Sequence, residues 1–143
     1  MFGEELILGY KEVSLDEKGR IFLPKFTGVE KGDKISVIEN ETGSFKLFNL
    51  MYMQRIIDEL NKKCCSKDQE RIQLLSDRLQ LLYYSYLTTC NVDSQRRIHI
   101  PQQILDEHGF SDKVIMQGSG TSLTVFNSKE SYNSYVRKLR ATK

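Results

Sequence analysis

Two stretches of the chain decide its fold, and they read VSLDEKGRIFLP at residues 13–24 and CNVDSQRRIHIP at residues 90–101. Both contain the pattern Asp-x-x-x-Arg-Ile-x-(Leu/Ile)-Pro. The correspondence continues downstream, where SFKLFN at residues 44–49 matches SLTVFN at residues 122–127. Because self-similarity along a chain marks a repeated structural unit, the sequence predicts two similar units, which we call the first and the second copy.

Within each copy the residues predict two short strands joined by a tight turn. Apolar residues such as Ile21 and Leu23 recur at the two-residue period of a half-buried strand. The segment 16–19, Asp-Glu-Lys-Gly, consists of residues that favour turns. The motif arginine of the first copy, Arg20, is therefore expected at the start of a strand, beside an exposed turn.

The turn of the second copy has Arg96 where the turn of the first copy has Gly19. A glycine suits a backbone with positive φ, whereas an arginine in that conformation costs about 1 kcal/mol. We therefore expect the second turn to differ from the first in detail.

The segment between the two motifs predicts helices, because its apolar residues recur every three or four positions. One helix is expected over residues 50–63, a break at 64–67 and a second helix over 68–86. The second helix carries an apolar stripe made of Ile72, Leu75, Leu79, Leu82 and Tyr86. This stripe fits either packing on the chain's own sheet or contact with another subunit.

Together these elements predict an α+β fold. A first β unit occupies residues 1–49, a helical hairpin residues 50–88, and a second β unit with a C-terminal helix residues 89–143, with one shared core. The 143 residues are 39% hydrophobic and 28% charged, which excludes collagen-like and disordered chains. The net charge of +2 excludes a generally polybasic surface, so any DNA contact depends on local clusters.

The sequence predicts neither export nor a membrane span. Acidic residues, Glu4 and Glu5, stand where a signal peptide needs basic ones. The longest apolar stretch, residues 79–87, is shorter than the roughly 18 residues that cross a bilayer. We therefore expect a cytoplasmic protein, whose cysteines, Cys64, Cys65 and Cys90, are reduced.

The doubled motif, the helical hairpin between its copies and the opening Met-Phe-Gly-Glu resemble the MraZ family of bacterial transcription regulators. The resemblance covers nearly the whole chain, although Arg96 stands where the family has glycine, and Lys25-Phe26-Thr27 lacks the family's alanine and arginine. It implies tandem SpoVT/AbrB-type swapped-hairpin units in a pseudo-two-fold, double-psi-barrel-like arrangement.

The resemblance also implies a function. Members of this family form ring-shaped homo-oligomers and bind direct repeats of DNA upstream of a division and cell-wall gene cluster. By analogy, this chain would be a sequence-specific, nucleoid-associated repressor. Its motif arginines, Arg20 and Arg97, would bind the double-stranded DNA.

Physical chemistry supports that role for the motif residues. An arginine raised on a rigid turn presents a planar guanidinium that reaches a phosphate or, with two hydrogen bonds, a guanine edge. Asp16 and Asp93 would repel phosphate, so we expect them to accept backbone N–H bonds in the turn or to orient the arginines. Phosphate contacts are expected from Lys18, Lys25 and Arg96. The alternative is that each Asp and Arg form only a surface ion pair.

No catalytic, metal or cofactor site is predicted. Cys90, His99 and His108 are too widely spaced for a compact zinc motif, and no phosphate-binding loop or activated nucleophile is evident. We therefore expect a protein that is not an enzyme and takes no small-molecule substrate. The alternative function is an antitoxin-like or scaffolding module that keeps the fold and binds other proteins instead of DNA.

Overall fold

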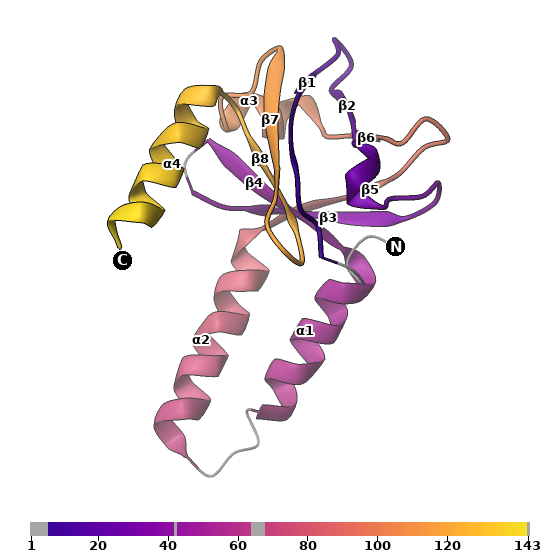
Figure 1. Ribbon diagram of the computed structural model, residues 1–143. Coiled ribbons are helices and arrows are strands. Elements are labelled where there is room, and N and C mark those ends of the chain that lie inside the picture. The colour runs from indigo at the N-terminus through magenta and orange to yellow at the C-terminus, as the bar shows by residue number, and fades with distance from the viewer. Residues whose placement is uncertain (1–5, 42, 64–67, 143) are drawn as a thin grey trace.

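The computed structural model describes residues 6–41, 43–63 and 68–142. Within these ranges the chain has the predicted α+β architecture, with a six-stranded antiparallel sheet, a two-stranded ribbon and four α-helices (Figure 1). The strands are β1 Tyr10–Ser14, β2 Arg20–Phe22, β3 Lys34–Glu39, β4 Ser44–Asn49, β5 Tyr86–Asn91, β6 Arg97–His99, β7 Lys113–Gly118 and β8 Leu123–Phe126. The helices are α1 Leu50–Lys63, α2 Gln69–Ser85, α3 Gln102–Glu107 and α4 Lys129–Ala141, with a short 3-10 turn, η1, at Lys25–Thr27.

The strands of the two copies are interleaved. The sheet has the order β1-β7-β8-β4-β3-β5, and the separate ribbon pairs β2 with β6. Every strand of the first copy therefore pairs with a strand of the second, as β1 with β7, β2 with β6, β3 with β5 and β4 with β8, and all of these pairs are antiparallel. The two copies thus complete each other's sheet.

The apolar side chains that alternate along the motif strands form one buried cluster drawn from both copies. Ile21, Leu23, Ile98 and Ile100 are each at most 1% exposed. Because successive side chains of a strand point to opposite faces, this burial turns the intervening residues of β2 and β6 outward.

The two predicted helices between the copies form a hairpin that projects away from the sheet (Figure 1). Helix α1 has the predicted bounds, and the predicted break at 64–67 lies outside the described residues. Helix α2 begins after Asp68, whose carboxylate caps it by accepting two backbone N–H groups, and it ends one residue before Tyr86, which starts β5. Leu75 and Leu79 are buried, so part of the predicted stripe packs on the chain itself.

Two short turns of helix follow the motif prolines and were not predicted from the sequence. They are η1 after Pro24 and α3 after Pro101. Proline fixes φ at a value that starts a helical turn, but elements of three and six residues are too short to show a helical period. None of the helices in the described ranges is long and apolar enough to cross a membrane.

Candidate nucleic-acid interface

The ribbon formed by β2 and β6, which we call the arginine ribbon, carries both motif arginines. Its inner face is made by Ile21 and Ile98, which lie opposite each other and are 0% and 1% exposed. Its outer face is made by the alternate residues of both strands, which are Arg20, Phe22, Arg97 and His99. In the register of the ribbon Arg20 lies opposite His99 and Phe22 lies opposite Arg97.

The turn before β2 is closed by hydrogen bonds to the carboxylate of Asp16. One oxygen, Oδ1, accepts the backbone N–H groups of Lys18 at 2.9 Å and of Arg20 at 2.8 Å. The other, Oδ2, accepts the Nε–H of the Arg20 side chain at 2.7 Å. Gly19 takes a left-handed conformation with φ of 78° and donates its N–H to the backbone oxygen of Asp16. The aspartate therefore closes the turn and orients the arginine.

The turn before β6 repeats this arrangement. Asp93 Oδ1 accepts the N–H groups of Gln95 at 2.8 Å and Arg97 at 2.9 Å, and Oδ2 accepts the Nε–H of Arg97 at 3.0 Å. Arg96 takes the left-handed conformation of Gly19, with φ of 57°. The expectation that this turn differs in detail was therefore wrong for the backbone. The Arg96 guanidinium lies over the Phe22 ring, 5.0 Å from its centroid, and such a cation–π contact offsets part of the strain.

The electrostatics of the two turns are alike. The pKa of Asp16 lies below its usual value, chiefly because its carboxylate accepts the backbone N–H of Arg20, and the pKa of Asp93 is lowered in the same way by the N–H of Arg97. Both aspartates are therefore ionised at neutral pH. From the guanidinium of its arginine, each carboxylate accepts only the Nε–H, and in the described part of the chain the other four N–H donors of each guanidinium have no hydrogen-bond partner.

The other basic residues predicted to bind DNA lie at the two ends of the ribbon. Because β2 and β6 are antiparallel, the two turns lie at opposite ends. Lys18 is exposed in the first turn, and Arg96 is partly exposed in the second. Lys25 is exposed on η1, just beyond Leu23, whose N–H donates to the Arg96 backbone oxygen at 2.7 Å. The ribbon therefore has one or two further cations at each end.

One residue of the outer face was missed by the sequence reasoning. Phe22 is half-buried and stands two residues after the first motif arginine, as His99 stands two residues after the second. The period of the strand indicates that both face outward, and this was inferred from the sequence for His99 but not for Phe22. Only the pairing register shows that each lies opposite the arginine of the other copy.

The residues considered for a metal site do not gather. Cys90 is buried, its thiol donates to the His99 backbone oxygen at 3.1 Å, and burial raises the pKa of the thiol to about 11. The His99 ring is exposed on the far side of β6, and the His108 ring packs 4.8 Å from that of Phe45. Among the residues that the structure describes, no group of three His, Cys, Asp or Glu side chains could hold a metal ion.

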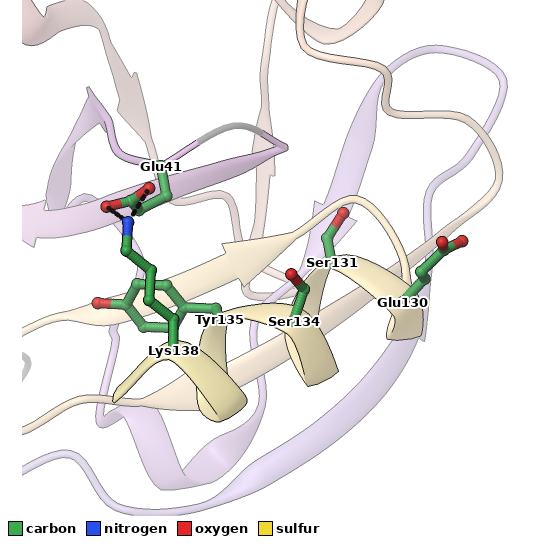
Figure 2. Close-up of a pocket in the computed structure, with 6 residues that line it drawn as sticks. All are labelled: Glu41, Glu130, Ser131, Ser134, Tyr135 and Lys138. Carbon is green, nitrogen blue, oxygen red and sulfur yellow. Dashed lines mark hydrogen bonds and ion pairs between the residues drawn. The ribbon is translucent and has the colours of Figure 1, made fainter. Parts of the chain in front are cut away.

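A hollow beside α4 lies apart from the arginine ribbon. Its volume is about 410 Å³, and Figure 2 shows its lining, which consists of Glu41, Glu130, Ser131, Ser134, Tyr135 and Lys138. Lys138 Nζ lies 3.1 and 3.2 Å from the two carboxylate oxygens of Glu41, so its charge is already paired. Because this lysine is paired, the hollow is a weaker candidate for binding nucleic acid than the ribbon. The two are separate in Figure 1, where α4 lies on the left and β2 and β6 lie on the right.

Comparison with known proteins finds relatives along most of the chain, although no protein-family model matches it. A protein of Leuconostoc citreum named "Transcriptional regulator MraZ" is 24% identical over 130 residues, which cover 91% of this chain and 86% of the relative. Proteins of the same name from Heliobacterium modesticaldum and Alkaliphilus metalliredigens are 21% and 22% identical over 93% and 87% of this chain, and over 88% and 83% of their own lengths. These matches confirm the resemblance to the MraZ family, whose members are transcriptional regulators and not enzymes.

Proposed function

On the premise that the chain is similar to MraZ transcriptional regulators over most of its length, we propose that it is a transcriptional regulator that binds double-stranded DNA through the arginine ribbon. One observation carries the proposal. Two Asp-capped turns hold Arg20 and Arg97 on the same face of one ribbon. Diagonal neighbours on such a face are about 7–8 Å apart, and a two-stranded ribbon fits the major groove of DNA.

The side chains have three different roles in the proposed recognition of DNA. Arg20 and Arg97, with their free N–H donors, contact phosphates or the O6 and N7 atoms of guanine. Lys18, Lys25 and Arg96, which flank the ribbon, contact phosphates and contribute affinity that depends on salt. Asp16 and Asp93 touch no DNA and act as positioning residues for the arginines.

The fold completes this proposal. We assign residues 1–49 and 89–143 to two swapped-hairpin units of the SpoVT/AbrB type that share one core, with residues 50–88, which hold the helical hairpin and the start of β5, between them. The pairing of every first-copy strand with a second-copy strand supports this assignment. The motif turns are then pseudo-equivalent, as a pseudo-two-fold arrangement requires.

One subunit offers too few cations for tight binding, so we propose that the chain acts as a ring-shaped homo-oligomer. Linking several ribbons makes the later contacts intramolecular and raises avidity by roughly 10²–10⁴. Large apolar side chains left exposed on α2 and α4 support subunit contacts there, and they include Leu74, Leu81, Tyr84 and Leu139.

A ring presents its ribbons in one direction and favours direct repeats in DNA. The targets are a division and cell-wall gene cluster, which the protein represses at the nucleoid.

The test compares the wild type with the Arg20→Ala/Arg97→Ala variant on duplexes that the wild type selects from random DNA. Each lost arginine contact is expected to weaken binding about tenfold, and the two together about 100-fold. The control variant is Arg55→Ala/Arg71→Ala, which removes the same charge from exposed positions on α1 and α2 and should bind like the wild type.

Equal binding by the wild type and the ribbon variant would remove the arginines from the DNA contact. If the wild type binds no DNA even at low salt and co-purifies with another protein in fixed ratio, the chain is an interaction module instead.

A further inference from the structure

The two ends of the arginine ribbon differ in the residue that lies opposite each motif arginine. Position 22 in the first copy corresponds to position 99 in the second, because each stands two residues after its motif arginine. The register places His99 opposite Arg20 at one end and Phe22 opposite Arg97 at the other. An arginine therefore has an imidazole as its neighbour at one end and a phenyl ring at the other.

The turn residues increase this difference. At the first end Gly19 has no side chain that could cover the His99 ring. A Cβ atom at position 19 would already be in van der Waals contact with the ring, 3.7 Å from Cδ2. At the second end the guanidinium of Arg96 lies on the Phe22 ring. His99 is accordingly exposed, whereas Phe22 is half-buried. The first end thus offers a polar ring to a ligand, and the second offers an apolar ring backed by a cation.

The inner face shows no such difference. Ile21 and Ile98, which lie opposite each other, are the same residue with nearly the same burial. The two Asp-capped turns also have the same backbone hydrogen bonds. The scaffold is therefore alike at both ends, so the chemical difference resides in Phe22, His99 and the residues beside them.

We propose that Phe22 and His99 are specificity-determining residues that make the ribbon read an asymmetric base sequence in one direction. This inference rests on the proposed DNA binding by the ribbon. The phenyl ring favours the C5-methyl group of thymine at the Arg97 end, and the imidazole hydrogen-bonds a base edge or phosphate at the Arg20 end. Two equal ends would bind a half-site equally well in either direction, because turning the ribbon end over end would exchange like groups.

The first experiment compares the sequences that wild type, Phe22→Ala and Arg55→Ala select from random duplex DNA. Wild type and the Arg55→Ala control are expected to select an asymmetric half-site with thymine at one end. Phe22→Ala is expected to lose about tenfold of its preference for that thymine while keeping the positions read by the arginines. A symmetric wild-type half-site, or an unchanged preference in Phe22→Ala, would overturn the inference.

The second experiment measures direction with the exchanged variant Phe22→His/His99→Phe. A DNA-cleaving iron chelate is attached through Glu17→Cys, an exposed position in the first turn, in a background that carries Cys64→Ser and Cys65→Ser. On a duplex whose half-sites all point one way, the parent protein should cut at the end of each half-site away from the thymine. The exchanged variant should cut at the thymine end.

Cleavage on the same side by both proteins would also overturn the inference. The Arg20→Ala/Arg97→Ala variant separates this failure from failure of the proposed function. If that variant binds as well as the wild type, the ribbon does not bind DNA at all. If it loses binding while the exchange changes nothing, the ribbon binds DNA but its direction is set elsewhere.

Discussion

The turns over residues 16–20 and 93–97 have the same hydrogen bonds, and the fourth residue of each has a left-handed backbone. That residue is glycine in the first turn and arginine in the second. The difference shows that glycine is not what fixes this turn. The aspartate fixes it by accepting two backbone N–H groups, and that bonding holds even a residue whose own preference opposes the conformation. Position 96 is then able to carry a cation that contacts Phe22.

The largest effect is expected where the two copies are most alike. Ile21→Ala and Ile98→Ala should each lower the free energy of unfolding by about 2–5 kcal/mol, because each removes a fully buried side chain and leaves a cavity. Urea denaturation measures both, with Met51→Ala, at a 59% exposed position on α1, as a control that should change little. Clearly unequal losses for the two isoleucines would mean that the ribbon's inner face is not equivalent in the two copies.

The next effect separates the two turns. Gly19→Ala should destabilise the protein by about 1–3 kcal/mol, because the new Cβ would lie 2.7 Å from the Ile100 backbone oxygen at a φ of 78°. Arg96→Gly should change stability by less than about 1 kcal/mol, since relief of strain opposes loss of the cation–π contact. Thermal unfolding of both variants gives the comparison. A tolerated alanine at position 19 would show that the first turn shifts more readily than its contacts suggest.

Acid should loosen both turns together. Folding lowers the pKa of Asp16 and Asp93 from the ordinary value of 3.8, so the ionised carboxylates stabilise the turns above that pH. This stabilisation is lost as the pH falls below 3.8 and both groups take up protons. Hydrogen exchange at the Arg20 and Arg97 amides, compared between pH 5 and pH 3 after correction for the intrinsic rate, should show reduced protection at both. Asp16→Asn should remove the pH dependence at Arg20 alone.

The smallest effect concerns Cys90 on β5, whose thiol lies against the backbone of His99. Cys90 corresponds to Val13 in the first copy, and its thiol is a weak donor to the His99 backbone oxygen. Cys90→Val should therefore change the free energy of unfolding by less than about 1 kcal/mol. With its pKa raised to about 11, native Cys90 should also resist alkylation at pH 8 in a Cys64→Ser/Cys65→Ser background, as mass spectrometry would show. Rapid alkylation would indicate that β5 opens.

Local signals in the sequence were enough for most of the elements but not for their partners. Helix α1 was predicted with its bounds because its apolar period and the end of that period are local features. The Asp-capped turns were predicted because Asp and Arg recur at one spacing. The pairing of β1 with β7 was not predicted, since alternation shows which face of a strand is buried but not which strand lies beside it.

The candidate site shows the same boundary between local and non-local information. Arg20 and Arg97 were identified as candidates from the motif, and the structure places them on one surface. Phe22 was overlooked because its place opposite Arg97 follows from a register between residues more than seventy positions apart in the sequence. The left-handed conformation of Arg96 was not predicted either, because it depends on the cap formed by Asp93 and on a ring from the other copy.

The interleaving of the strands also has a consequence during synthesis. β1, at residues 10–14, must wait for its partner β7, at residues 113–118, to leave the ribosome. At about 5–20 residues per second that delay is roughly 5–20 s, a long time for an unpaired strand edge to stay exposed to other chains. Nascent chains translated side by side from one messenger are therefore at risk of exchanging their N-terminal strands, and a chaperone that covers the first fifty residues would lower that risk.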